Sequence, residues 1–197
     1  DTWQKLLKGE SGAESITQFD LDGLRSHVIA TVKDFSPEKF YIDGKMCNKM
    51  DKFQQITFAG AVEASRMAKI PLRHPENHDV VLEEFQGMKK AVDDPYRMGT
   101  MLGIGVGGMQ SFSEQSEIMQ AKGARRVSPF FVPKLIINLA GGWVSQATGA
   151  MGVNTSFVTA CASGNNAIGE SFLAIKNNRA DIIYTGGFES AICKLSI

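Results

Sequence analysis

Apolar residues recur with a helical period between residues 48 and 70. The stretch NKMDKFQQITFAGAVEASRMAKI contains six apolar side chains at helical intervals: Met50, Phe53, Ile56, Phe58, Ala61 and Val62. A period near 3.6 residues is the signature of an amphipathic helix with one buried side. The pattern therefore predicts one long helix over residues 48–70.

The pattern changes period twice between residues 154 and 187. Residues 156–159 (SFVT) are a short apolar run, residues 164–177 have helical spacing, and residues 181–185 (DIIYT) are apolar again. A strand, a helix and a strand in this order predict a βαβ unit with parallel strands. The stretch YRMGTMLGIGVGGM, which begins at Tyr96, adds a further apolar strand that runs into glycines. We therefore expect an α/β fold with a parallel or mixed sheet.

Three more helices are predicted from start and stop signals. Residues 1–8 carry apolar side chains on one side and end at Gly9. SFSEQSEIMQAKG predicts a helix capped by Ser113 and ended by Gly123. The stretch 128–150 opens with two prolines and continues as a buried helix rich in small residues.

Residues 71–96 have no clear period. They are charged and are interrupted by Pro71, Pro75 and Pro95, which predicts an excursion on the surface, partly helical around VLEEFQGMKKAV. Further upstream, KDFSPEKF is predicted to be a loop.

Composition and charge exclude several classes of function. Hydrophobic residues make up 43% of the 197 residues and charged residues 21%, as in ordinary soluble globular proteins. The 21 basic and 21 acidic side chains cancel, so no global field draws the chain to nucleic acid or membrane. No apolar run reaches the roughly 18–20 residues needed to span a bilayer. The chain opens on Asp1 and a helix rather than on a signal peptide, and without an initiator methionine we expect an upstream segment.

The three cysteines, Cys47, Cys161 and Cys193, form no CxxC pair, which favours a reducing compartment. Cys161 lies at the junction between the strand SFVT and the helix that begins ASGNNAIG. The free N–H groups and the positive dipole end of that helix favour a thiolate. A sharp strand-to-helix turn also exposes a nucleophile beside backbone donors for an oxyanion. The competing interpretation is a buried structural cysteine, the commonest fate of a free thiol.

Other motifs give weaker indications. GIGVGG fits G-x-G-x-x-G, but no second strand ending in an acid follows about 20 residues later, so we reject a dinucleotide site. His74 and His78 are separated by Pro75 and have no third partner, so a solvated loop is favoured over a metal site, and His27 stands alone.

Basic residues gather at KGARR and near residues 45–49. Lys122, Arg125 and Arg126 belong to the first group, and Lys45 and Lys49 to the second. Such groups usually form a solvated face, and the functional alternative is a docking patch for an acidic partner.

Four stretches together carry a resemblance to a known family. RVSPFFVPKLIINLAGG, NTSFVTACASGNNAIGESF, ADIIYTGGFESAI and MGTMLGIGVGGM resemble the β-ketoacyl-acyl-carrier-protein synthases, in particular the elongating type II (KAS II-like) condensing enzymes. DTWQKLLKGESG and NKMDKF resemble the same family in the same order. The resemblance covers nearly the whole chain apart from a surface insertion near residues 72–92. CASG alone is shared with thiolases, but SPFFVP is not typical of them.

The resemblance implies a thiolase-like fold with α/β/α/β/α layers, of which residues 1–197 are mainly the N-terminal half. It implies that Cys161 accepts an acyl group from acyl-ACP and that decarboxylative Claisen condensation with malonyl-ACP follows. By motif position, Val106 would line the acyl pocket, and Phe131 would reach across a homodimer interface. Arg125 and Arg126, and more loosely Lys45 and Lys49, would dock the acyl carrier protein. No cofactor and no metal is implied.

The sequence also departs from the family pattern. Val153 stands between Gly152 and Asn154 where the family usually shows GPN, and Asn166 stands where some members have histidine. The first glycine-ending strand of the family and the histidines and lysine of its second half have no counterpart in this sequence. We therefore expect Cys161 of this chain to be acylated without condensation.

Two other hypotheses stay open. One is a non-catalytic half-chain that pairs with a condensing partner or only docks carrier protein. The other is a thiolase-like enzyme that acts on CoA thioesters. The expected location is the cytoplasm, a plastid or a mitochondrion, not the secretory route.

Overall fold

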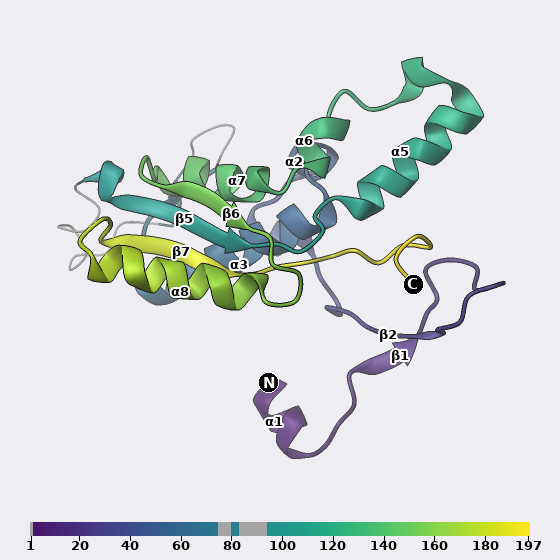
Figure 1. The fold of residues 1–197 in the computed structure, drawn as a ribbon, viewed down its shortest axis with the longest axis horizontal. Helices are drawn as coiled ribbons and strands as arrows, with labels where there is room; N and C mark the ends of the chain where they lie inside the picture. The colour runs from purple at the N-terminus through teal and green to yellow at the C-terminus, as the bar shows by residue number, and fades with distance from the viewer. Residues whose placement is uncertain (1, 75–79, 83–93) are drawn as a thin grey trace.

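The computed structural model describes residues 2–74, 80–82 and 94–197, and its centre is a three-stranded parallel sheet (Figure 1). The strand order is β6–β5–β7, with β5 (Met98–Gly103) between β6 (Asn154–Phe157) and β7 (Ile182–Gly187). Thr100 of β5 lies opposite Asn154 on one side and Tyr184 on the other. Helix α8 (Ser163–Lys176) connects β6 to β7, which confirms the predicted βαβ unit and the parallel sheet.

Helices cover both faces of this sheet. Helix α8 packs on one face and α7 (Asn138–Thr148) on the other, with α3 (Lys52–Ala68) against α7. Because side chains alternate along a strand, Met98 and Leu102 of β5 both point to the α3 and α7 side. Two of the core clusters form there, one around Met98 and one around Leu102 and Phe53. The core on this side of the sheet holds β5 and β7 in place, and with them the carboxyl ends of both strands.

The remaining elements surround this centre. Helix α1 and the antiparallel pair β1–β2 lie apart from the sheet, whereas α5 and α6 extend from its carboxyl end (Figure 1). Their bounds are α1 Thr2–Leu7, β1 Ala13–Ser15, β2 Val28–Ala30, η1 Pro37–Phe40, α2 Gly44–Lys49, β3 Leu72–Arg73, β4 Val80–Leu82, η2 Pro95–Arg97, α5 Met109–Lys122, η3 Ala124–Arg126 and α6 Phe131–Leu135. Helix α1 ends before Gly9 as predicted, but its apolar side chains are exposed. No helix in the described ranges is long and apolar enough to cross a membrane.

The prediction of one helix over residues 48–70 is wrong, because the chain forms two helices separated at Asp51. Met50 is extended (φ −110°, ψ 136°) and ends α2. Asp51 then begins α3 by accepting a hydrogen bond from the Phe53 N–H at 3.1 Å, while Gln54 accepts one from the Asp51 N–H at 3.1 Å. This reciprocal capping box satisfies N–H groups that a helix end leaves unpaired. A new helix therefore starts inside an uninterrupted apolar period.

The predicted start of the next helix at Ser113 is also wrong, since α5 begins at Met109. Its N-cap is Gly108, which has no side chain to cap the helix. Instead, the second carboxylate oxygen of Asp51 accepts a hydrogen bond from the Ser111 N–H at 3.0 Å. Asp51 is only 3% exposed, so one buried carboxylate caps α3 and α5 together. The end of α5 at Gly123 (φ +81°) agrees with the prediction.

The predicted helix within residues 128–150 is divided into α6 and α7. Ile136 is extended between them, and the buried small residues Ala140, Gly141 and Ala147 belong to α7. The predicted insertion near residues 72–92 lies largely outside the described residues. Its described parts, β3 and β4, pair antiparallel.

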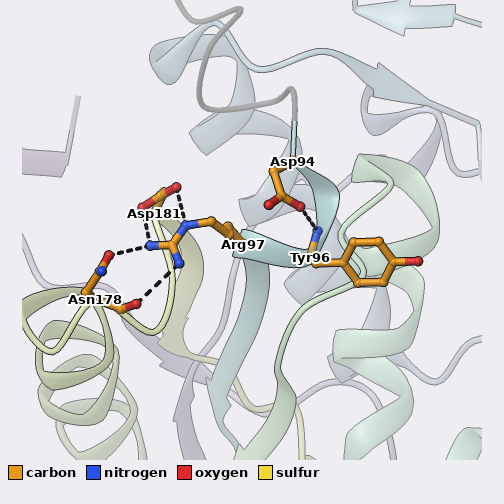
Figure 2. Close-up of polar contacts among 5 residues, drawn as sticks. All are labelled: Asp94, Tyr96, Arg97, Asn178 and Asp181. Carbon is orange, nitrogen blue, oxygen red and sulfur yellow. Dashed lines mark hydrogen bonds and ion pairs between the residues drawn. The ribbon is translucent and has the colours of Figure 1, made fainter.

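Charged side chains join the amino ends of β5 and β7 (Figure 2). Arg97 binds Asp181 through two hydrogen bonds, from Nε at 2.6 Å and from Nη2 at 2.7 Å. The same guanidinium donates to the side-chain oxygen of Asn178 at 2.7 Å and to the backbone carbonyl of Asn178 at 3.3 Å. Hydrogen bonds from Arg97 hold the pKa of Asp181 below its ordinary value. This end of the sheet is thus fixed to the end of α8 by side chains.

Candidate active site

Cys161 lies in a tight turn between β6 and α8, two residues before the first residue of α8. The preceding residue, Ala160, has φ +49°. That left-handed conformation is uncommon for a residue with a Cβ, and such strained positions cluster at functional sites. The Cys161 side chain is exposed. The predicted sharp strand-to-helix turn with an exposed thiol is present.

Ser163 holds this turn together from inside. Its hydroxyl donates to the Ala160 carbonyl at 2.6 Å and accepts from the Thr159 N–H at 2.9 Å. Ser163 is 3% exposed, whereas its partners Thr159 and Ala160 are exposed, so the hydroxyl holds the turn from its buried side. Two backbone bonds, from Ala162 to the Thr159 carbonyl and from Ser163 to the Ala160 carbonyl, complete the turn. The backbone around Cys161 is therefore preorganised.

Glycines let the start of α8 approach the ends of β5 and β7. A Cβ built on Gly103 would lie 2.2 Å from the Ser163 carbonyl group and 2.4 Å from the Gly164 nitrogen. A Cβ on Gly187 would lie 2.9 Å from the Gly164 Cα. Atoms that are not bonded to each other do not approach so closely, so the contact requires glycine at these positions. Backbone therefore lies directly on backbone where α8 begins.

A cavity of about 540 Å³ opens beside the thiol. Its wall includes residues from the loop after β5, from the Cys161 turn and from the end of β7: Gly103, Gly105, Val106, Ala160, Cys161, Ser163, Gly164, Asn165, Gly187, Phe188 and Glu189. Two residues predicted from the sequence, Cys161 and Val106, thus line one cavity. A volume of this size is typical of sites for small ligands.

Cys161 differs from the other two thiols in its access to solvent. It is exposed, whereas Cys193 is buried and Cys47 is partly buried. Burial, with a further contribution from Glu38, raises the pKa of the Cys47 thiol above its ordinary value. Because the thiolate is the nucleophilic form, Cys47 is poorly suited to react at neutral pH. The structural-cysteine interpretation therefore fits Cys193 and Cys47 but not Cys161.

Glu189 is a site residue that the sequence analysis missed. It follows β7 and lies in the wall of the Cys161 cavity. Its carboxylate accepts hydrogen bonds from the N–H of Val106 at 2.7 Å and of Gly107 at 3.3 Å. A single acid after a glycine pair carries no local signal of such a contact, because its partners lie 82 and 83 positions upstream.

The other predicted site residues lie outside this cavity wall. Phe131 begins α6, and its ring packs against that of Phe112 with centroids 6.4 Å apart. Arg125 and Arg126 are exposed in η3, beyond the end of α5. Lys45 and Lys49 belong to α2, and the Lys49 ammonium lies 5.8 Å from the centre of the Phe130 ring.

The histidines are not gathered into a metal site within the described residues. His27 is exposed and its Nε2 lies 3.1 Å from the Leu24 carbonyl oxygen. His78 lies outside the described residues. Among the residues that the structure describes, no group of three or more His, Cys, Asp or Glu side chains is arranged to hold a metal ion.

A parallel sheet between helices, with an exposed cysteine at a strained strand-to-helix turn, defines an α/β protein with a nucleophile-type turn. The chain belongs to the β-ketoacyl synthase family: its residues 1–197 match the family described as "Beta-ketoacyl synthase, N-terminal domain". The resemblance to elongating KAS II-like enzymes is confirmed by curated relatives. The chain is 37% identical to the 3-oxoacyl-[acyl-carrier-protein] synthase 2 of Staphylococcus aureus over 196 residues, which is 100% of this chain and 44% of that protein. It is 34% identical to the protein of the same name from Synechocystis sp., covering 100% of this chain and 42% of the relative.

Solved structures confirm the thiolase-like fold class. The ishigamide ketosynthase/chain length factor superposes with a TM-score of 0.74 at 22% identity, over 98% of this chain and 43% of that one. The structure of a type II PKS acyl-carrier protein in complex with its ketosynthase bound to the hexaketide gives a TM-score of 0.67 at 23% identity, over 83% and 42% of the two chains. The chain thus spans less than half the length of the curated relatives it matches.

Proposed function

We propose that this chain is the acyl-accepting part of a fatty-acid elongating β-ketoacyl-ACP synthase, with Cys161 as the nucleophile. The observation that carries the proposal is the exposed Cys161 thiol at a strained turn, facing a cavity whose near wall is glycine backbone. The cavity leaves this sulfur accessible to a thioester carbonyl. Membership of the β-ketoacyl synthase family gives that geometry its chemistry.

The proposed first step is an exchange of thioesters. The Cys161 Sγ, as thiolate, attacks the carbonyl carbon of acyl-ACP and forms a tetrahedral oxyanion. Collapse of this intermediate breaks the bond to the carrier's sulfur, which leaves as a thiol after taking up a proton, and the acyl group stays on Cys161. We assign one oxyanion donor to the Cys161 backbone N–H, because the turn holds it in a fixed place. Val106 would contact the acyl chain in the cavity wall.

The second step is proposed for the complete protein. There, decarboxylation of malonyl-ACP would release carbon dioxide and supply the carbanion that attacks the carbonyl carbon of the Cys161 thioester. The new carbon–carbon bond forms as the bond to the Cys161 Sγ breaks, so that Cys161 leaves as a thiolate and β-ketoacyl-ACP is released. The names of the Staphylococcus and Synechocystis relatives support acyl carrier protein as the carrier.

Two contacts with partners belong to the same proposal. Arg125 and Arg126 are exposed beyond α5 and would meet an acidic carrier protein, with Lys45 and Lys49 contributing from α2. Phe131 would reach the pocket of a second subunit in a homodimer. In support, Phe131 lies at the start of α6 and does not line the Cys161 cavity of its own chain.

The test is acyl transfer followed by intact mass and peptide mapping on the full-length protein. Incubation with butyryl- or palmitoyl-carrier protein should add one acyl group at Cys161. Cys161→Ser should abolish the added mass, because a neutral hydroxyl is a far weaker nucleophile than a thiolate. The matched control, Cys47→Ala, should be acylated at the wild-type rate.

Each other outcome counts against a stated part of the proposal. No acylation of the wild-type protein would support the non-catalytic half-chain instead. Faster acylation from acyl-CoA than from acyl-carrier protein would support the thiolase-like alternative. Acylation at Cys47 would remove Cys161 from its role.

A further inference from the structure

Glu189 connects the end of β7 to the glycine loop after β5. Its carboxylate lies 2.7 Å from the Val106 nitrogen through one oxygen and 3.3 and 3.4 Å from the Gly107 nitrogen through both. The Ser190 N–H also donates to it at 3.0 Å. All the described hydrogen bonds to this side chain come from backbone N–H groups. The carboxylate therefore acts on backbone position rather than as half of an ion pair.

The loop that Glu189 holds on one side is held on its other side by the end of α6, where the Gly108 N–H donates to the Leu135 carbonyl at 3.2 Å. Gly105, Gly107 and Gly108 flank Val106, and Gly107 has φ +83°. Glycine loses more conformational freedom on folding than other residues, so such a loop needs external anchors. Hydrogen bonds from N–H groups to a carboxylate are stronger than those to a neutral acceptor. The Val106 side chain, 51% exposed, projects from this anchored loop into the cavity wall.

Glu189 also lines two cavities. It lines the 540 Å³ cavity of Cys161 and a second cavity of about 730 Å³ whose wall includes Lys52, Ile56 and Cys193. Shortening the side chain would remove a wall residue of both cavities and the acceptor of the Val106 N–H at the same time. Both changes enlarge the space that an acyl chain on Cys161 could occupy.

We infer that Glu189 is a positioning residue that sets the length of acyl chain accepted by Cys161, by holding Val106 and by lining the cavity. This inference rests on the proposed acyl transfer to Cys161. A residue needed only for folding would instead lower the transfer of every acyl group alike.

The experiment compares chain-length selectivity in the full-length protein and three variants. Rates of Cys161 acylation from butyryl- and palmitoyl-carrier protein are measured by intact mass. Glu189→Ala should raise the palmitoyl-to-butyryl rate ratio by at least about tenfold, as expected for loss of charge-assisted hydrogen bonds. Glu189→Gln should raise it less, because the amide keeps the volume, and Glu189→Asp should return toward the wild-type ratio because it keeps the charge.

A matched control and a second readout separate selectivity from damage to the site. Glu170→Gln, at an exposed position on α8, should leave the ratio unchanged. Iodoacetamide, which needs no acyl cavity, should alkylate Cys161 in all variants within about twofold of the wild-type rate. An unchanged ratio in Glu189→Ala and Glu189→Gln, or an equal fall in both rates, would overturn the inference.

Failure of the proposed function would be recognised separately. If no thioester acylates the wild-type protein, amide hydrogen exchange at Val106 and Gly107 still tests the anchor. Glu189→Ala should accelerate exchange at these two amides by at least about tenfold, because their hydrogen bonds are lost. Unaltered exchange would show that Glu189 does not hold the loop.

Discussion

At the amino ends of β5 and β7 the strands are joined by side chains, whereas at their carboxyl ends backbone lies directly on backbone. At the amino ends, the Arg97 guanidinium donates hydrogen bonds to the side chains of Asp181 and Asn178 (Figure 2). Gly103 and Gly187 receive the start of α8 at the second end, with no side chain between them. Both ends connect the same two strands to the same helix.

The difference lies in what each arrangement leaves open. Side-chain bonds fill the space between elements, and a partner can be replaced at modest cost because water is near. The glycine contact places no side chain between the strands and α8, and there is no room for an added atom at Gly103 or Gly187. The candidate active site therefore lies at the end of the sheet where adding even one carbon atom to a residue is expected to disturb the packing.

The largest effect is expected from Gly103→Ala. The new Cβ would lie 2.2 Å from the backbone of Ser163, which cannot move without displacing α8. We expect the free energy of unfolding to fall by about 3 kcal/mol or more, measured by urea denaturation.

The control for this change is Gly142→Ala in α7. There the nearest heavy atom to the new Cβ is at 4.0 Å, and alanine is favoured over glycine inside a helix. This variant should be as stable as the wild type or more stable by about 0.5–1 kcal/mol. Equal losses in the two variants would refute the argument from backbone contact.

An intermediate effect is expected from Ser163→Ala. The change removes the acceptor of the Thr159 N–H and the donor to the Ala160 carbonyl, both inside the turn. The Ala160 carbonyl keeps the Ser163 N–H as a donor, so the loss of the two side-chain hydrogen bonds should lower the free energy of unfolding by about 0.5–1.5 kcal/mol. Ser171→Ala, in the same helix, is the control, because its buried hydroxyl only adds a bond to the Ala167 carbonyl. If Ser171→Ala costs as much, the turn has no special dependence on Ser163.

The smallest effect is expected at the amino end, from Asp181→Asn. The pair with Arg97 is partly exposed, so at neutral pH we expect the melting temperature to fall by only about 2–4 °C. The folded-state pKa of Asp181 lies below the ordinary value of about 3.9 because Arg97 binds the carboxylate. Its stabilising effect is therefore complete above that pH and is lost as the pH falls through the lower folded-state value.

The pH dependence supplies the check. The difference in melting temperature between the wild type and Asp181→Asn should narrow as the pH falls below about 3.9. The control Asp22→Asn, at an exposed position between β1 and β2, should leave the melting temperature at neutral pH close to that of the wild type. A difference that stays constant with pH would mean that the charge of Asp181 does not contribute.

Sequence patterns predicted the centre of the fold but not two of its helix starts. The short apolar runs of β5, β6 and β7 and the period of α8 are local signals, and they identified the parallel sheet. Asp51 and Gln54 have the spacing of a capping box, but the sequence analysis did not use this signal and followed the unbroken apolar period instead. The start of α5 could not be found locally, since its cap is the carboxylate of Asp51, 60 positions away.

The candidate site was predicted in part for the same reason. Cys161 was predicted from the turn between a strand and a helix, Val106 from the family resemblance, and both line one cavity. Glu189 was missed because its hydrogen bonds depend on β5 and β7 being neighbours in the sheet. The roles of Phe131, Arg125, Arg126, Lys45 and Lys49 remain predictions, since each concerns a partner molecule.

The glycine contact behind Cys161 also has a genetic consequence. Every missense change of a glycine codon adds at least one carbon atom, so Gly103, Gly164 and Gly187 have no conservative neighbour in sequence space. A saturation library of this chain selected for folding should therefore lose nearly all variants at these three codons while retaining many at Gly142. Part of the cavity wall beside Cys161 is thus formed by positions at which folding itself restricts substitution.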